Sequence, residues 1–402
     1  MGLRRTIAFL PWLHLAETVQ LGQIRFVPFV TSSPDSELAA VTTSLPVILS
    51  GYRDVQGQPV TACTVSFPAG QKPGEDLAEQ HVQAIQTAAA LLCLAALAEN
   101  DYCSPGAYVN SSPFQPYFQC FTEPVEDIAL QIRRRDGRTL VGGYKHGEIV
   151  FTMPVQCSQI SSRFRIDKPF AEALGSALAC GSSVARRLVP ALAFFNLANT
   201  DSEAMSTEAE VILSGAAFEQ LLDVSGAGDL ACEVGELLRP YGAVEVDKAV
   251  AHRPGIMLGV KYVKTQQAWV CDAQLAQAQK AWFLHQKWAE ELHHRRSVLV
   301  HGQDPQARTW GWDLREHLVM GGFVFPLLVK LCLAREGRYS LTENDECRCA
   351  AIDPLLARSD WFNVVGGNSL ATGWRETIRK VRSHRATLEW VQQAWRQRGL
   401  SE

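Results

Sequence analysis

The 402-residue chain lacks the short motifs that mark several common enzyme classes. It has no Gly-rich loop that ends in Gly-Lys-Ser or Gly-Lys-Thr, which a P-loop nucleotide hydrolase uses to hold phosphates. It has neither the Gly-x-Ser-x-Gly turn of a serine hydrolase nor the His-Glu-x-x-His pattern of a zinc protease. These absences disfavour a nucleotide hydrolase, a serine hydrolase and a zincin.

Paired cysteines are also absent. The chain has eleven cysteines, an odd number, and no two of them are separated by two residues. The nearest pair, Cys347 and Cys349, has one residue between them. A disulfide framework or a zinc site would show pairs at characteristic spacings. We therefore expect reduced, mostly buried thiols in a cytoplasmic protein, with no metal and no other cofactor.

The chain has no excess of positive charge and no long uninterrupted apolar run. Its 38 Lys and Arg residues face 42 Asp and Glu residues, so any nucleic-acid binding must come from a local patch. The longest apolar stretch, residues 318–333, is shorter than the ~20 residues of a membrane span and contains Pro326 and Lys330. We expect a buried core helix there and no membrane partner.

The pattern of the chain changes near residue 165. The first part alternates short β-like runs with turn residues and contains one long helical pattern, residues 74–99. The predicted strands are 6–10, 23–29, 38–49, 60–67, 117–122, 128–133 and 148–155. The second part is helical, with a hairpin or loop at 240–264. The predicted helices are 170–180, 184–198, 206–222, 228–238, 272–300, 312–335, 353–358 and 372–398.

We therefore predict an α+β protein. A β-rich, mixed N-terminal domain spans residues 1–165 and has a sensing or regulatory role. An all-α bundle follows over residues 166–402 and ends in a basic helix. At 402 residues, the chain is long enough for two or three domains.

The most informative stretch is residues 282–302, WFLHQKWAEELHHRRSVLVHG. It holds four of the ten histidines, together with the adjacent Arg295 and Arg296. Its apolar residues can form a buried helical stripe, with the polar residues along one flank. Arg296 and His301 are five residues apart, about 7.5 Å along a helix and about 140° around it. A long arginine side chain can swing toward the imidazole at that separation.

An arginine beside a histidine suits phosphodiester chemistry. Histidine titrates near neutral pH and can take or give a proton. Arginine stays charged, and its planar fork matches a phosphate. RNA carries its own nucleophile, the 2′-hydroxyl. A base for that hydroxyl and a cation for the phosphate are sufficient to cleave RNA, and charge stabilisation is often the largest catalytic effect.

The stretch Arg296-Ser-Val-Leu-Val-His301-Gly302 resembles the Arg-x4-6-His motif of HEPN (higher eukaryotes and prokaryotes nucleotide-binding) domains. It is more closely similar to the Apea-like branch of that superfamily. A second match is Glu210–Leu222, which resembles an earlier helix of the branch, with Glu219 as its acidic residue before two leucines. The resemblance covers about residues 170–330. Many active members of the wider superfamily have Asn, Asp or His where this chain has Ser297.

This resemblance implies a helical bundle that forms a homodimer and joins two Arg–His pairs in one cleft. It implies an endoribonuclease that cleaves RNA, such as tRNA, without metal and leaves a cyclic phosphate. Many such proteins are toxins or anti-phage abortive-infection effectors, so a phage-derived trigger is an expected partner. Arg296 would hold the phosphate, and His301 would act as general base or acid. The expected substrate-binding residues are Arg295, Ser297 and His294.

Other interpretations remain open at this point. Basic residues in the last turn of a helix also stabilise its dipole, by about 0.3–1 kcal/mol each. Some HEPN domains are silent and only dimerise or bind RNA or protein. The chain could also pair, as a toxin, with a nucleotidyltransferase-like antitoxin. His293 and His294 face about 100° apart on a helix and are poor joint metal ligands.

The tail, residues 372–398, holds seven basic and two acidic residues, with three interleaved tryptophans. Two interpretations fit this pattern. The tryptophans can pack inward and leave a solvated basic face, or the basic and aromatic residues can contact RNA.

Overall fold

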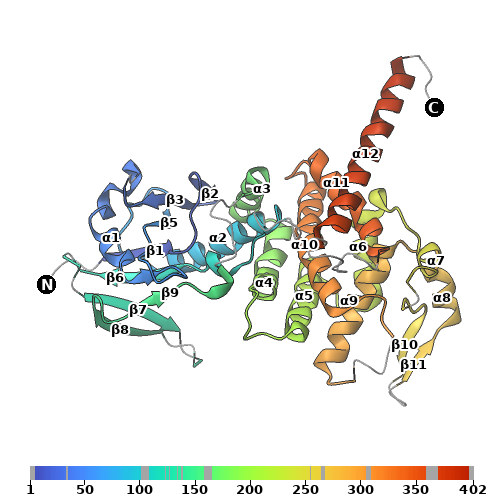
Figure 1. Cartoon of the computed structure of the whole chain (residues 1–402), viewed down its shortest axis with the longest axis horizontal. Helices are drawn as coiled ribbons and strands as arrows, with labels where there is room; N and C mark the ends of the chain where they lie inside the picture. The colour runs from blue at the N-terminus through green and yellow to red at the C-terminus, as the bar shows by residue number, and fades with distance from the viewer. Residues whose placement is uncertain are drawn as a thin grey trace. The chain divides into compact units, whose positions relative to one another are not determined.

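The computed structural model (Figure 1) divides into two compact units, one ending at Met205 and one beginning at Ser206. The residues that it describes are 5–32, 35–100, 108–122, 124–125, 127–133, 135–136, 139–157, 165–253, 255–263, 268–304, 309–358 and 370–397.

The N-terminal unit is built on an antiparallel sheet. Its strands are β1 (Arg5–Leu10), β2 (Val19–Leu21), β3 (Ile24–Val30), β5 (Ala62–Pro68), β6 (Tyr117–Phe121), β7 (Asp127–Arg133) and β8 (Thr139–Lys145). They lie in the order β2-β3-β5-β1-β6-β7-β8. The short strands β4 (Tyr52–Arg53) and β9 (Phe151–Thr152) pair in parallel beside it.

Both faces of the sheet are covered. The 3-10 helix η1 (Ser36–Val41) and helix α1 (Ser44–Leu49) pack on one face, where Phe9, Val27 and Phe29 belong to the same buried cluster. Side chains alternate along a strand, so Leu10 and Phe26 point to the opposite face, and both are fully buried. Helix α2 (Glu79–Leu97) contacts β2, β3 and β5.

Two further helices belong to this unit. Helices α3 (Lys168–Ala179) and α4 (Ser183–Ala198) both contact α2. The Ser111 hydroxyl also donates to the carbonyl of Asn196, at 2.6 Å. The division between the units therefore follows α4. It does not fall at residue 165, where the sequence pattern first becomes helical.

The C-terminal unit is mainly helical. Its longer helices are α5 (Thr207–Leu222), α6 (Ala227–Leu238), α9 (Leu284–Val300), α10 (Leu314–Arg335), α11 (Glu343–Leu356) and α12 (Leu370–Gln397). Shorter elements lie between α6 and α9. They are η4 (Arg239–Tyr241), α7 (Val246–Ala249), β10 (Val260–Val263), β11 (Ala268–Cys271) and α8 (Ala273–Gln279). Helices α5, α6 and α11 contact α9, while α10 contacts α5, α6 and α11. In the core, the Phe218 ring meets the rings of Trp288 and Phe325 edge-on, at 5.7 and 5.3 Å.

Two helices are long and apolar enough to cross a membrane by length and composition alone: α2 and α10. The bent pair α3 and α4 would be a third if it were one span. Most of α2 and α10 is buried inside the protein. The position of α10 agrees with the expected core helix at residues 318–333, and the absence of a membrane partner stays a prediction.

The predicted α+β class is confirmed, with strands in the first unit and helices dominating the second. Several local predictions differ from the structure. Only β9 (Phe151–Thr152) is a strand within the predicted 148–155, strand β8 was not predicted, and the helix predicted at 353–358 is the longer α11 (Glu343–Leu356). Residues 38–49 form η1 and α1 instead of a strand. Residues 272–300 form two helices, α8 and α9, instead of one. The hairpin or loop expected at 240–264 corresponds to the hairpin of β10 and β11, which begins later, at Val260, and ends at Cys271.

Candidate active site

Helix α9 is placed by its apolar residues. Leu284, Trp288 and Leu292 recur every four residues, and all three are fully buried. This spacing puts them on one face of the helix, which packs against α5 and α6. At the start of the helix, the Gln286 side chain accepts a hydrogen bond from the Phe283 amide at 3.1 Å. The sequence thereby fixes which face of α9 remains for function.

The end of α9 forms a helix-ending motif. Gly302 has a positive φ of 63°, and its amide donates to the carbonyl of Leu299. The Gln303 amide donates to the carbonyl of Val298 at 3.0 Å. This pair of bonds is the Schellman arrangement, in which glycine adopts the left-handed conformation at little cost. His301 is the residue at this end and is exposed.

The Gly302 conformation predicts opposite effects for two Gly→Ala changes. Gly302→Ala should destabilise the protein by about 1–2 kcal/mol, because a Cβ is disfavoured at positive φ. Gly228→Ala is the matched control, since Gly228 is exposed within α6 with open space where its Cβ would be. That change should stabilise the protein by about 0.5–1 kcal/mol. Thermal unfolding measures both, and a loss of stability in the two variants alike would contradict the assigned motif.

Arg296 faces α5 one turn and a half before His301. Its Nη1 lies 3.5 Å from Oε2 of Glu219, and its side chain is 32% exposed. Nε2 of His293 lies 3.6 Å from Oε1 of the same carboxylate and donates to the carbonyl of Ser225 at 3.3 Å. Figure 1 shows α5 and α9, which are distant in sequence, side by side. The structure therefore brings together the two segments that carry the family resemblance.

A glycine lets α5 and α9 approach at this place. Gly215 lies one turn before Glu219, and a Cβ added to it would be 3.1 Å from the Cβ of Arg296. A larger residue would push the Arg296 side chain off α5. Gly215 and Glu219 therefore set the position of Arg296 together.

The Glu219 carboxylate partly balances the positive charge of Arg296. Burial raises the pKa of the Glu219 carboxyl above its ordinary value, while the nearby Arg296 and His293 act in the opposite direction. Glu219 is thus poised to change charge at a higher pH than an exposed glutamate. Its protonation would remove the negative charge that lies 3.5 Å from the Arg296 guanidinium.

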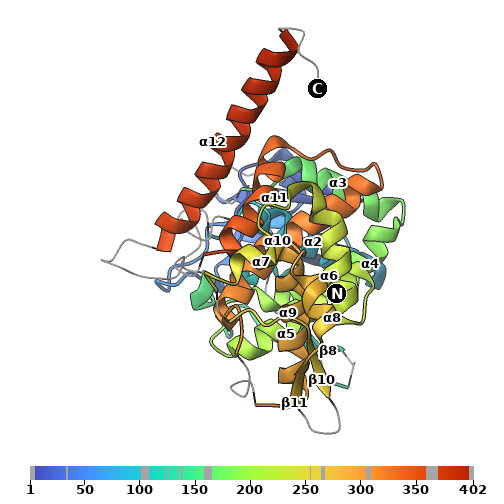
Figure 2. The same ribbon diagram turned by 90° about the vertical axis from the view of Figure 1, so that its right-hand side faces the viewer.

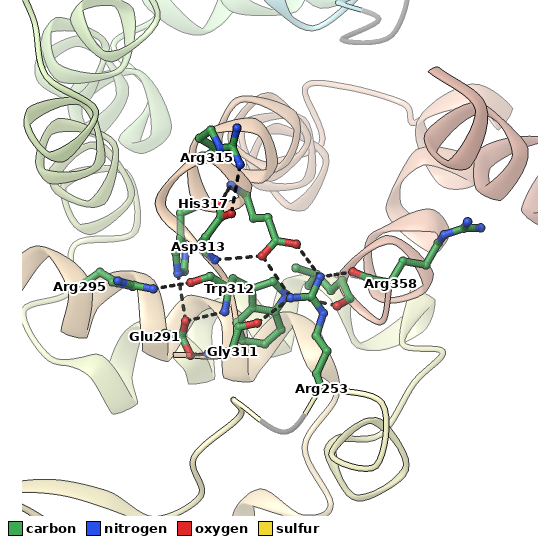
Figure 3. Close-up of polar contacts among 11 residues, drawn as sticks. Arg253, Glu291, Arg295, Gly311, Trp312, Asp313, Arg315, His317 and Arg358 are labelled. Atoms are coloured by element: carbon green, nitrogen blue, oxygen red, sulfur yellow. Dashed lines mark hydrogen bonds and ion pairs between the residues drawn. The ribbon is translucent and has the colours of Figure 1, made fainter. Parts of the chain in front are cut away.

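Arg295 lies in a different environment from Arg296, and Figure 3 shows it pointing toward Trp312. It is buried, and its Nη2 donates to the carbonyl of Trp312 at 2.5 Å. Its guanidinium also lies 4.0 Å from the centroid of the Trp310 ring. Burial lowers the pKa of Arg295 to about 10, against nearby carboxylates that raise it, so it remains charged at neutral pH. The predicted second phosphate ligand is a structural contact in this arrangement.

The contact between Arg295 and Trp312 belongs to a buried network of polar residues that the sequence did not predict. The Glu291 carboxylate accepts hydrogen bonds from the amides of Gly311 and Trp312, both at 3.0 Å, and from His317 at 3.2 Å. Figure 3 shows Arg253 on the other side of the same loop. It donates to the Gly311 carbonyl and pairs with Glu316 at 2.6 Å. The hydrogen bonds of this network hold residues 311–313 in place beside the helices around the candidate site.

The two other predicted substrate-binding residues lie on the same turn of α9. Ser297 and His294 are both partly exposed, and the Ser297 carbonyl accepts the His301 amide at 3.1 Å. The His294 ring meets His293 edge-on at 6.0 Å. The structure thus places Ser297 and His294 near Arg296 along the helix, whereas Arg295 turns inward.

A separate cavity of about 420 Å³ lies in the N-terminal unit. Trp12, Phe114 and Tyr117 contribute aromatic walls, and Gln86 and Asn196 contribute amides. None of the described residues that line it is charged. A phosphodiester requires cationic partners, so the α9 cluster fits this chemistry better than the cavity does.

Among the residues that the structure describes, no three His, Cys, Asp or Glu side chains are placed to hold a metal ion. Comparison of the chain with protein-family models, with curated proteins and with solved structures gave no match.

Proposed function

We propose that this protein is a dimeric, metal-independent endoribonuclease of the HEPN type, acting as a toxin or an anti-phage abortive-infection effector in the cytoplasm. Arg296 and His301 are its catalytic pair, and RNA, with tRNA as one candidate, is the substrate. The N-terminal unit has the sensing role, and a phage-derived trigger raises the rate of cleavage above a basal level. The dimer and the trigger enter this proposal from the family resemblance.

One observation carries the proposal. Arg296 and His301 share the solvent-facing end of α9, and Glu219 of α5 contacts Arg296 there. The two segments singled out by the resemblance therefore meet in space, although about 75 residues separate them in sequence. A chance occurrence of Arg-x4-His would have no reason to face the second segment.

The chemistry follows from the two side chains. His301 removes the proton of the 2′-hydroxyl, and the resulting oxygen attacks the adjacent phosphorus. The bond to the 5′-oxygen breaks, and a 2′,3′-cyclic phosphate forms. The Arg296 guanidinium stabilises the negative charge that develops on the phosphoryl oxygens. The 5′-oxygen leaves with a proton, which a second Arg–His pair in a dimer would supply.

A second function, a non-catalytic dimerising module that binds RNA or protein, is favoured by one feature. The Glu219 carboxylate partly neutralises Arg296, which reduces the pull of this cluster on a phosphate. In that case RNA would bind in a salt-sensitive manner and remain intact.

The test is RNA cleavage by the purified full-length protein in EDTA. Wild type should cleave, and Arg296→Ala should lose about 100-fold or more of the rate, because one charge-stabilising group of this kind contributes about 10²–10³. Arg335→Ala is the control, since Arg335 is an exposed cation on α10. Equal cleavage by wild type and Arg296→Ala would refute the assignment, and intact RNA with retained binding would favour the module.

The Glu219→Gln variant should bind RNA more tightly than wild type does. Removing one negative charge about 4 Å from the phosphate-binding guanidinium is worth about 1 kcal/mol in water, or about fivefold in Kd at low salt. The wild-type Kd should also fall as the pH drops through the raised pKa of Glu219, because protonation removes the same charge. The variant should lose that pH dependence. A wild-type Kd that rises as the pH is lowered would contradict the role given to Glu219.

A further inference from the structure

Helix α12 packs on its neighbours through side chains of its first half. The Trp374 ring is buried and meets the ring of Phe323 edge-on at 5.1 Å. Thr377 is buried one turn later, and Arg385 forms an ion pair with Glu346 of α11. In Figures 1 and 2 the C-terminal end of α12 extends beyond α11. The first half of the helix is therefore packed, and the second half projects.

A flank of α12, about 80–160° around the helix from Trp374, carries a stripe of exposed residues, defined here as Arg375, Arg379, Arg382 and Trp390. At 100° per residue these four side chains fall within about 80° of one another, and they extend over about 22 Å of the helix. The indole of Trp390 is 69% exposed. We call this surface the α12 stripe.

The contact of Arg382 differs from those of two other cations on α12. Lys380 is paired with Glu376 at 2.8 Å, and Arg385 is paired with Glu346. By contrast, Arg382 donates to the amide oxygen of Asn344 at 2.9 Å. That partner is neutral and does not offset the positive charge of the guanidinium. A solvated helix face that served only solubility would not need a mainly exposed tryptophan in line with its arginines.

We propose that the α12 stripe binds single-stranded RNA at a site separate from Arg296 and His301. The arginine forks hold successive phosphates, and the Trp390 indole stacks on a base. An aromatic ring in line with cations is the arrangement that tracks a single strand without reading its sequence. A membrane-bound helix would instead present a broad apolar face, and the apolar face of α12 is already packed at Trp374.

The inference deepens the proposed ribonuclease function by giving it a substrate class and a second contact. It is tested by measuring RNA binding. The α12 stripe can therefore fail to bind RNA while Arg296 and His301 cleave it, and cleavage can be absent while the stripe binds RNA. The probe is a 12-nucleotide oligouridine with a 5′ fluorophore, bound to the full-length chain carrying His301→Ala so that the RNA stays intact. Fluorescence anisotropy gives the Kd at several salt concentrations.

Trp390→Ala should weaken binding by about tenfold, since stacking on an aromatic ring is worth about 1–3 kcal/mol per base. Trp390→Phe should retain most of the affinity. Arg379→Ala should reduce the slope of log Kd against log salt by about 0.7, the value for one phosphate contact on a single strand. Arg335→Ala, on α10, should leave Kd and slope unchanged. Circular dichroism of each variant confirms that α12 is still folded.

A fully paired RNA of the same length should bind more weakly, because its bases are not free to stack on the indole. The inference is overturned if Trp390→Ala and Arg379→Ala both bind like the parent chain. It is equally overturned if duplex and single strand bind alike, or if anionic lipid vesicles bind the chain through Trp390 while the oligouridine does not.

Discussion

Replacing His301 with alanine is expected to lower the rate of RNA cleavage by about 10²–10⁴-fold, the contribution of one positioned general acid or base. His301 is exposed at the end of α9 and contributes no buried contact, so the variant should unfold at the same temperature as wild type. Single-turnover cleavage of a labelled RNA measures the rate, and thermal unfolding checks the fold.

His252→Ala is the matched control for this experiment. His252 is also an exposed histidine of the C-terminal unit, three residues after the end of α7, and it lies outside the Arg296 cluster. It should cleave at the wild-type rate. If His301→Ala cleaves as fast as His252→Ala, the imidazole at the end of α9 does not transfer the proton.

The largest expected effect on stability is that of Glu291→Ala, about 3–5 kcal/mol. Glu291 is buried, and its removal leaves the amides of Gly311 and Trp312 and the Nε2 of His317 without their acceptor. Breaking a buried charged contact from one side has a cost of this size. Chemical denaturation with an unchanged m-value would measure the difference.

The buried Glu291 carboxyl should also make the stability of the folded protein depend on pH. Burial opposes ionisation of the Glu291 carboxyl, but His317 and the amides of Gly311 and Trp312 outweigh it and lower its pKa. A lowered pKa in the folded state gives stability that is present above the unfolded pKa and is lost as the pH falls through the folded value. Glu291→Ala should therefore lose part of the acid-induced destabilisation of wild type.

Glu233→Ala, on the exposed face of α6, is the control for Glu291 and should change stability by less than about 0.5 kcal/mol. If Glu291→Ala were no more destabilising than Glu233→Ala, the buried network would not hold the loop at 311–313.

The sequence predicted the elements whose apolar residues keep one clear period. Helix α10 and strands β1, β3, β5, β6 and β7 lie close to their predicted positions. Residues 38–49 misled the prediction, since their Val, Thr and Ile content suits a strand. Leu38, Val41, Leu45 and Ile48, all buried, follow the spacing of three to four that suits a helix. In that segment the spacing was the better guide.

The candidate site was predicted in part. Arg296, His301 and Glu219 were singled out from sequence, and the structure places Glu219 beside Arg296. The burial of Arg295 was not predicted, because α9 was assumed to have one apolar face. Its first three turns are buried nearly all round, including His285 and Glu291. Charged residues in such a helix must be paired, but the partners come from distant segments that no local pattern identifies.

The central claim is that Arg296 and His301 cleave RNA through the attack of its own 2′-hydroxyl. The most direct measurement uses a short RNA with a single 2′-deoxy nucleotide at the mapped cleavage position, digested in EDTA beside the all-ribose RNA. The account predicts no cut at the substituted position and a 2′,3′-cyclic phosphate on the 5′ product of the all-ribose RNA. Cleavage at the 2′-deoxy position, or a product ending in a 3′-hydroxyl, would contradict it.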